Sequence, residues 1–296
     1  MLPVWFRTPR EPTPPSPPHP SLNSLYTMPH TPKQMYKTSL IATLGTTPPV
    51  VTEFVRYMQE AEKTNATDLT IITTQEQKVL EGLELVKQAI KNRYPKLHQH
   101  TKTLPIKDVT TEEENYTFMK HMAQTLIEQH TVHRTNSIHL SLAGGRKDMS
   151  VTAALLAQYL GVNGVYHIVM PNIDLVNQQL EALRHQIKQL AETQDKEAYY
   201  QQHREEFDQV LYPPLHQYHV IKIPVIPYPK TILRKIHQLL SKPKTEKPPP
   251  GIPIDVIDGM AAAGLIRVTT RGTIYTLEHG QKLHQILTEA GIDKLI

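Results

Sequence analysis

The chain has 296 residues, no cysteine and a formal net charge of +4. The lack of cysteine excludes disulfides, thiolate nucleophiles and cysteine-ligated zinc, so a hydrophobic core must hold the fold and a reducing, cytoplasmic location is expected. No apolar run approaches the roughly 20 residues of a membrane-spanning helix, so we expect no membrane partner. The length is enough for one sizeable core and a smaller second domain.

Positive charge is concentrated near the C-terminus. Residues 35–226 contain 19 Lys and Arg against 21 acidic residues, whereas residues 227–296 contain ten against six. A general polyanion binder usually carries a basic face. Phosphate recognition in the central part must therefore be local, whereas the C-terminal part could contact nucleic acid.

Residues 1–34 contain ten of the 25 prolines and show no hydrophobic periodicity. Such a composition cannot bury enough surface to offset the entropy cost of ordering. We therefore expect a disordered tail. Met35 directly precedes the first strand-like run, so an early start codon would account for the tail.

From residue 38 onward, short β-branched runs alternate with longer helical stretches, the pattern of a parallel sheet wrapped by helices. The expected strands are 39–43, 69–74, 103–106, 137–142, 165–170 and 218–223. The expected helices between the first five are 50–62, 75–91, 111–130 and 145–160. The sequence thus predicts an α/β fold, with a parallel-sheet domain over residues 35–228.

The regular alternation stops after the fifth strand, where residues 172–210 are polar and strongly helical. Apolar residues recur on one stripe of this segment, at Leu175, Leu180, Leu183, Ile187 and Leu190. This pattern predicts an inserted helical hairpin. It could act either as a lid over a bound ligand or as a rigid hairpin at a dimer interface.

Residues 229–296 show the order helix, helix, hairpin, helix. The first two helices are expected at 231–240 and 253–264, and Arg271-Gly272 marks the turn of the hairpin. This order predicts a small winged-helix domain. The second helix has no Lys or Arg and no separate recognition helix is apparent, so we favour a role in dimerisation or packing over DNA binding.

Two loops follow strands of the predicted sheet, at the edge where ligands of open parallel sheets bind. Gly45-Thr46-Thr47 provides a flexible backbone, two hydroxyls and free N–H groups at a helix N-terminus, which favour an anion. Gly144-Gly145-Arg146-Lys147 adds two glycines that permit close approach and two cations. A plain turn followed by a solvated Arg-Lys pair would have the same sequence pattern. However, cations at a helix N-terminus are repelled by the helix dipole, and a bound anion would offset this repulsion.

The sequence gives less support to other nucleotide-binding motifs, to metal binding and to acid–base catalysis. Neither loop has the glycine and lysine spacing of a dinucleotide fingerprint or a Walker phosphate loop. The pairs His98/His100 and His130/His133 lie in polar stretches without a carboxylate at ligand spacing, so we expect solvated surface, no metal site and no cofactor. The acidic run 112–114 is explained as a charge run at a helix N-terminus, where Thr111 and Glu114 have capping-box spacing.

The segments 42–53 and 140–150 resemble the two signature motifs of the CRISPR-associated Rossmann-fold (CARF) family that includes the ring nucleases. Weaker matches follow in order along the chain, at Thr73-Thr74, Asp108, Asn115, Tyr212-Pro213 and 221–224. The resemblance covers roughly residues 36–228, and the C-terminal winged helix is similar to that of some members. It implies a Rossmann-like fold for the sheet domain.

The resemblance also implies a homodimer whose paired loops form a two-fold pocket for cyclic oligoadenylate, usually the tetra-adenylate. Thr47 and Lys147 would then support attack by the ribose 2′-hydroxyl on the neighbouring phosphorus, giving linear products with a 2′,3′-cyclic phosphate and ending a CRISPR type III antiviral signal. The family commonly has Ser where this chain has Thr47, whose methyl group restricts the rotamer and is expected to slow turnover. The expected ligand-binding residues are Gly45, Thr46, Thr74, Gln75, Asn115, Gly144, Gly145 and Arg146.

Two other classes of function remain open at this point. In a transcriptional regulator, the same pocket would sense the messenger and the basic C-terminal domain would bind DNA. In an accessory nuclease gated by the messenger, the C-terminal domain would carry the active site, but it shows no catalytic His-Arg or carboxylate cluster.

Deleting residues 1–34 should change neither folding nor activity, because this tail lacks the composition to join a core. Thermal unfolding of the full chain and the shortened chain measures this. A large drop in melting temperature would show that the tail docks on the folded part.

Overall fold

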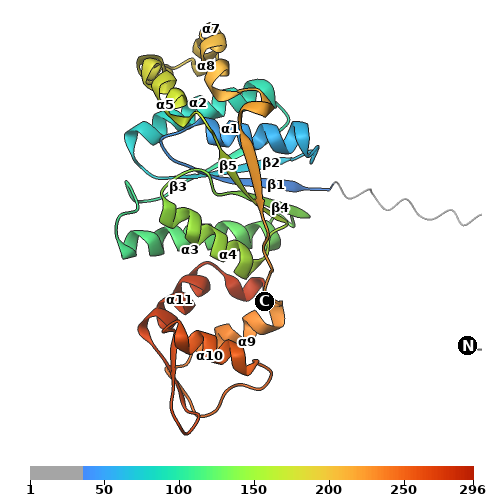
Figure 1. Ribbon diagram of the computed structural model, residues 1–296, viewed down its shortest axis with the longest axis vertical. Helices are drawn as coiled ribbons and strands as arrows, with labels where there is room; N and C mark the ends of the chain where they lie inside the picture. Colours follow the sequence, from blue (N-terminus) through green and yellow to red (C-terminus); the bar gives the residue numbers. More distant parts are fainter. Residues whose placement is uncertain (1–35) are drawn as a thin grey trace, which may run out of the picture. The chain divides into compact units, whose positions relative to one another are not determined.

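The computed structural model describes residues 36–296 (Figure 1). Its larger sheet has six strands. The predicted tail, residues 1–34, lies outside the described residues. The strand order is β3-β2-β1-β4-β5-β6. The strands are β1 (Thr38–Leu44), β2 (Asp68–Thr73), β3 (His98–Thr103), β4 (Ser137–Ser141), β5 (Gly164–Val169) and β6 (His219–Ile223). The predicted α/β fold is confirmed.

Helices cover both faces of the sheet (Figure 1). One face carries α1 (Pro49–Arg56), which continues as a π-helical turn (Tyr57–Ala61), and α2 (Gln77–Arg93). The other face carries α3 (Glu112–Thr131) and α4 (Lys147–Leu160). Every residue of β1 is buried, as expected for a central strand covered on both sides. Within residues 36–296 no helix is both long and apolar enough to cross a membrane.

The strand order reverses between β1 and β4. From β1 the chain moves outward through β2 to β3, and it then returns to β4 on the other side of β1. Since β1 and β4 pair in parallel, their carboxyl ends lie side by side. This is the switch point at which open α/β sheets bind ligands.

Two expectations about the sheet are wrong. The third strand is not 103–106 but β3, whose mostly polar, exposed residues pair with β2 through the backbone at the edge of the sheet. An edge strand needs no apolar run, so the hydrophobic pattern misses it. The sixth strand, β6, runs antiparallel to β5, because no crossover helix returns the chain to the opposite end of the sheet before β6 begins.

The insertion between β5 and β6 contains four short helices rather than one hairpin. They are α5 (Ile173–Ala182), α6 (Arg184–Glu192), α7 (Lys196–Gln202) and α8 (Arg204–Leu211). Leu180, Ile187 and Phe207 of the insertion pack with Leu85 and Ala89 of α2. The insertion therefore has a small core of its own, attached to the sheet domain through α2.

The C-terminal part has the predicted order of elements, with one extra strand in the loop between its first two helices. Its elements are α9 (Lys230–Leu240), β7 (Lys244–Thr245), α10 (Ile254–Ala262), β8 (Ile266–Val268), β9 (Ile274–Thr276) and α11 (Glu278–Glu289). The strand order is β7-β9-β8. Leu287 of α11 joins the apolar core of α3 and α4, and Lys120 Nζ lies 2.5 Å from Glu289 Oε2. The winged-helix class and the domain boundaries stay predictions.

Glu53 is a buried carboxyl group without a hydrogen-bond partner within residues 36–296. This residue of α1 has no exposed surface. Burial raises the pKa of Glu53 from 4.5 to about 8. The folded protein therefore holds this carboxyl in its neutral form at pH 7.

The folded state binds the Glu53 proton more tightly than the unfolded state does. The contribution of this proton to the free energy of unfolding is therefore complete below pH 4.5. It is lost as the pH rises towards 8. Glu53→Gln should remove this dependence and leave the variant more stable than the wild type at pH 8. Urea unfolding at pH 5 and pH 8 measures the difference. If both proteins lose the same stability between these pH values, Glu53 does not titrate in that range.

Candidate functional site

The loops after β1 and β4 touch through their backbones. A Cβ atom added to Gly144 would lie 1.8 Å from the carbonyl oxygen of Thr43, and one added to Gly45 would lie 2.7 Å from the amide nitrogen of Gly145. The Thr43 hydroxyl donates a hydrogen bond to the Gly144 carbonyl oxygen at 2.5 Å. Gly145 has φ +89°, a conformation that L side chains rarely adopt. Glycine is thus required for the two loops to form one surface.

Two helix N-termini open at this surface. Helix α1 follows the first loop and α4 follows the second. In α1, Pro48 and Pro49 have no N–H, and the Val50 and Val51 N–H groups donate to the Thr47 and Pro48 carbonyl oxygens. In α4, no side chain caps the first-turn N–H groups. Unsatisfied N–H groups and the positive end of a helix dipole favour an anion. The shared surface therefore has the chemistry of a phosphate site.

The two cations at the start of α4 differ in their partners. Arg146 Nε lies 2.7 Å from Asp108 Oδ1, and Arg146 Nη2 contacts Asp108 Oδ2. The Arg146 guanidinium holds the pKa of Asp108 below its usual range. Lys147 is exposed and makes no ion pair within residues 36–296. One cation is thus oriented by a carboxylate and the other remains available.

A cavity of about 210 Å³ lies beside the shared surface, and we call it the loop cavity. Leu44, Glu76, Lys107, Asp108 and Met149 contribute to its wall. It brings together several predicted ligand-binding residues from three parts of the chain: Gly45, Thr46, Thr74, Gly145 and Arg146.

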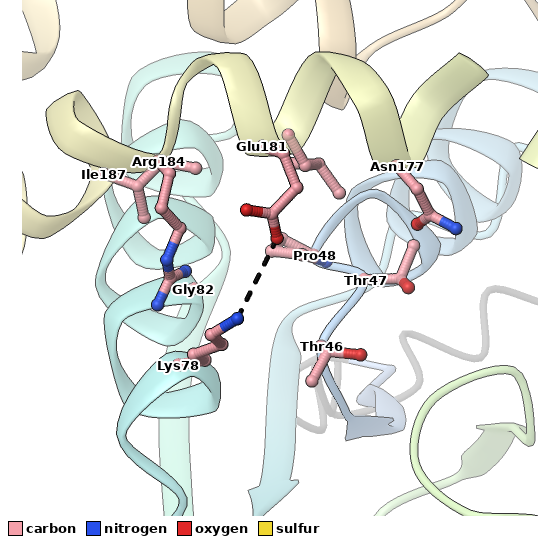
Figure 2. A pocket seen from close by; sticks show the side chains of 10 residues that line it. Thr46, Thr47, Pro48, Lys78, Gly82, Asn177, Glu181, Arg184 and Ile187 are labelled. Atoms are coloured by element: carbon pink, nitrogen blue, oxygen red, sulfur yellow. Dashed lines mark ion pairs between the residues drawn. The ribbon is translucent and has the colours of Figure 1, made fainter. Parts of the chain in front are cut away.

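A second cavity, of about 310 Å³, lies on the other side of the first loop, and we call it the insertion cavity (Figure 2). Thr46, Thr47 and Pro48 form one wall. Side chains of α2, α5 and α6 form the rest, which places the helical insertion directly beside the predicted catalytic Thr47. Thr46 lines both cavities.

The remaining predicted residues lie outside the two cavities. The Gln75 backbone N–H donates to the Ile106 carbonyl oxygen at 2.8 Å, and the residue is exposed. Asn115 Oδ1 accepts a hydrogen bond from Thr152 Oγ1 at 3.0 Å, which ties α3 to α4 behind the second loop. Gly144 supports the loop contact, and Lys147 lines neither cavity. Their roles in binding or catalysis stay predictions.

The histidines behave only partly as expected. His98 and His100 are exposed, yet pairing of β3 with β2 brings Asp68 Oδ1 to 3.2 Å from His100 Nε2. His130 is wrongly predicted as solvated, since it is partly buried and its Nε2 lies 2.8 Å from the Gly161 carbonyl oxygen. No group of three or more metal-ligating side chains in residues 36–296 is arranged to hold an ion.

Sequence reasoning missed most of the cavity walls. Asp108 was expected only as a family match, and its pairing with Arg146 spans 38 positions that no local pattern connects. The insertion residues of the second cavity, Asn177 and Arg184 among them, stand in a polar helical segment without any motif.

A family model and a relative of known activity both connect this chain with CRISPR systems. A family model described as CRISPR-associated protein NE0113 matches residues 47–248. A CRISPR system ring nuclease from Saccharolobus solfataricus is 29% identical over 134 residues, which cover 44% of this chain and 70% of that protein. A solved structure of Enterococcus italicus Csm6 bound to cyclic hexa-2′-fluoro-hexa-dAMP aligns with a TM-score of 0.42 and 15% identity over 69% of this chain. The alignment spans 47% of that Csm6 chain, and at this score it supports no conclusion about function.

Gly144→Ala should destabilise the protein and distort both loops, because the new methyl group would meet the Thr43 carbonyl group. Gly259→Ala is the matched control, since a Cβ at Gly259 of α10 meets no atom within 4 Å and alanine favours a helix. Urea unfolding should show a loss of about 1–3 kcal/mol for Gly144→Ala and no loss for Gly259→Ala. Equal stability of the two variants would contradict the close contact between the loops.

Proposed function

The chain belongs to the CRISPR-associated protein NE0113 family, and from this premise we propose that it is a ring nuclease acting on cyclic oligoadenylate. The observation that carries the proposal is the contact between the loops, which gathers the first loop, the uncapped N-terminus of α4, Arg146 and Lys147 at one surface. The similarity to a ring nuclease over 134 residues supports it. The proposed role is to end a CRISPR type III antiviral signal by opening its messenger, cyclic tetra-adenylate.

The proposed reaction uses a nucleophile that the substrate itself brings. A ribose 2′-oxygen attacks the adjacent phosphorus and loses its proton, while the bond from phosphorus to the 5′-oxygen breaks and that oxygen gains a proton. The ring becomes a linear chain with a 2′,3′-cyclic phosphate and a 5′-hydroxyl. The enzyme must align these atoms and stabilise charge on the phosphorane, tasks that need no metal ion.

Three side chains and two glycines near the shared surface have roles in this scheme. The Lys147 ammonium stabilises the negative phosphorane oxygens, and the Thr47 hydroxyl positions the attacking 2′-oxygen. Arg146 binds a phosphate by exchanging one anionic partner, Asp108, for another. The backbone of Gly45 and Gly145 approaches the phosphates closely because no side chain intervenes.

The proposed enzyme is a homodimer with a pocket on its two-fold axis. Val151 and Leu155 of α4 are 60% and 61% exposed, and together with Lys147 they recur at a spacing of four residues along one helix face. An exposed apolar stripe that begins at the proposed catalytic lysine is a suitable surface for a second copy of the chain. A two-fold pocket also matches the symmetry of a cyclic tetranucleotide.

The alternative is a messenger-sensing transcriptional regulator. It is supported by the basic C-terminal part, where residues 227–296 contain ten Lys and Arg against six acidic residues. However, α10 contains no Lys or Arg. Binding of duplex DNA that depends on cyclic oligoadenylate, without ring opening, would favour the regulator over the enzyme.

Lys147→Ala should abolish ring opening and leave the fold intact, because it removes the cation proposed to stabilise the phosphorane from an exposed position. Arg146→Ala should mainly weaken binding. The matched control is Lys96→Ala, an exposed lysine just before β3, at the opposite end of the sheet. Single-turnover cleavage of cyclic tetra-adenylate and its dissociation constant separate the two roles.

Cleavage at the wild-type rate by folded Lys147→Ala protein would remove Lys147 from catalysis. An unchanged dissociation constant for Arg146→Ala would place Arg146 outside the pocket.

A further inference from the structure

The proposed reaction uses Thr47 on the wall of the insertion cavity but gives no role to the side chains of α2, α5 and α6 that form the rest of this wall. This cavity has a volume of about 310 Å³, within the range of small-molecule pockets, roughly 300–1,000 Å³. It shares Thr46 of the first loop with the loop cavity, and residues at the start of α2 line both cavities. A ligand whose phosphate lies at the loop surface can therefore place its next chemical group in the insertion cavity.

The charges of the insertion cavity are already balanced. Lys78 Nζ of α2 lies 4.0 Å from Glu181 Oε1 of α5, the ion pair drawn in Figure 2. Arg184 Nη2 of α6 lies 2.5 Å from Glu81 Oε2, whose side chain is only 4% exposed. Each of the two cations thus has a carboxylate beside it, so the cavity has no excess of positive charge. The loop surface does have such an excess, because Lys147 makes no ion pair within residues 36–296.

The other walls suit a flat, uncharged group. Pro48, Leu180 and Ile187 supply apolar surface. Gly82 lets α2 pack directly against Pro48, whose Cγ would lie 2.9 Å from a Cβ at residue 82. Apolar walls with a few polar groups at fixed positions are typical of pockets for heterocyclic ligands. A nucleobase has this character, with apolar faces and a hydrogen-bonding edge.

Asn177 of α5 stands out among the polar side chains of this cavity. Carboxylates only accept hydrogen bonds, and Lys and Arg only donate them, whereas a side-chain amide does both from one planar group. An Asn amide fits the edge of adenine, accepting from N6 and donating to N7. The Asn177 side chain is exposed at the cavity wall, and Figure 2 shows it on the same side of the cavity as Thr47.

We infer that the insertion cavity is a nucleobase subsite in which Asn177 reads an adenine of the ring. This inference rests on the proposed function and adds a specificity residue to it. The first loop then divides the ligand, with phosphate on the side of Gly145 and Arg146 and base on the side of α5 and α6. The helical insertion supplies base recognition that the two loops, made of backbone and cations, lack.

The test compares two rings that differ only at the base. Cyclic tetra-adenylate and the same ring with purine in place of adenine, which lacks the N6 amine, are titrated by calorimetry in 2′-deoxy form so that neither can be cleaved. The wild type should bind the adenine ring at least about five-fold more tightly. Asn177→Ala and the nearly isosteric Asn177→Leu should bind both rings equally. Gln178→Ala, at an exposed neighbour on α5 outside the cavity, should behave as the wild type.

The readout is a ratio of two affinities, so a partly unfolded variant lowers both and leaves the ratio unchanged. Discrimination that survives in both Asn177 variants would overturn the inference, as would a wild type that does not discriminate. If the wild type binds neither ring and does not open cyclic tetra-adenylate made with ribose, both the proposed function and the base subsite are wrong. If the wild type opens the ribose ring but the Asn177 variants still discriminate, only the subsite is wrong.

Discussion

The close contact between the backbone after β1 and the backbone after β4 is the constraint on which the site depends. Thr43 and Gly144 meet at a distance that no side chain at residue 144 could permit, and Gly45 and Gly145 meet in the same way one step further along. The parallel pairing of the two strands brings the loops together, and the glycines let them touch. As a result, two helices begin at one surface, where the first-turn N–H groups of α4 lie beside the side chains of Arg146 and Lys147.

This arrangement accounts for the proposed phosphate recognition in a part of the chain with no excess of basic residues. The central part of the chain has slightly more acidic than basic residues, so attraction must come from groups at one place. The positive ends of α1 and α4 supply part of it, and Arg146 and Lys147 supply the rest. Arg146 is oriented by Asp108, whereas Lys147 extends from the first turn of α4 into solvent. The first loop also borders the insertion cavity, so one turn of backbone can separate a phosphate from a base.

Sequence reasoning reached the sheet, its switch point and both loops, because apolar runs and glycine positions are local signals. It misplaced the third strand, since β3 is a polar edge strand held by backbone pairing. It missed the antiparallel direction of β6 and the division of the insertion into four helices, which depend on packing against α2. The Asp108–Arg146 pair and the walls of the insertion cavity arise only when distant segments fold together, and Asn177 carries no motif that could have indicated it.

The most direct measurement of the central claim is the product of wild-type protein incubated with cyclic tetra-adenylate in excess EDTA. The proposed mechanism predicts ring opening at the same rate as without EDTA, to linear chains with a 2′,3′-cyclic phosphate and a 5′-hydroxyl, because the substrate supplies its own nucleophile. An intact ring would contradict the account. So would cleavage that returns only when a divalent ion is added, or products with a 5′-phosphate, since either result indicates attack by water with a metal ion.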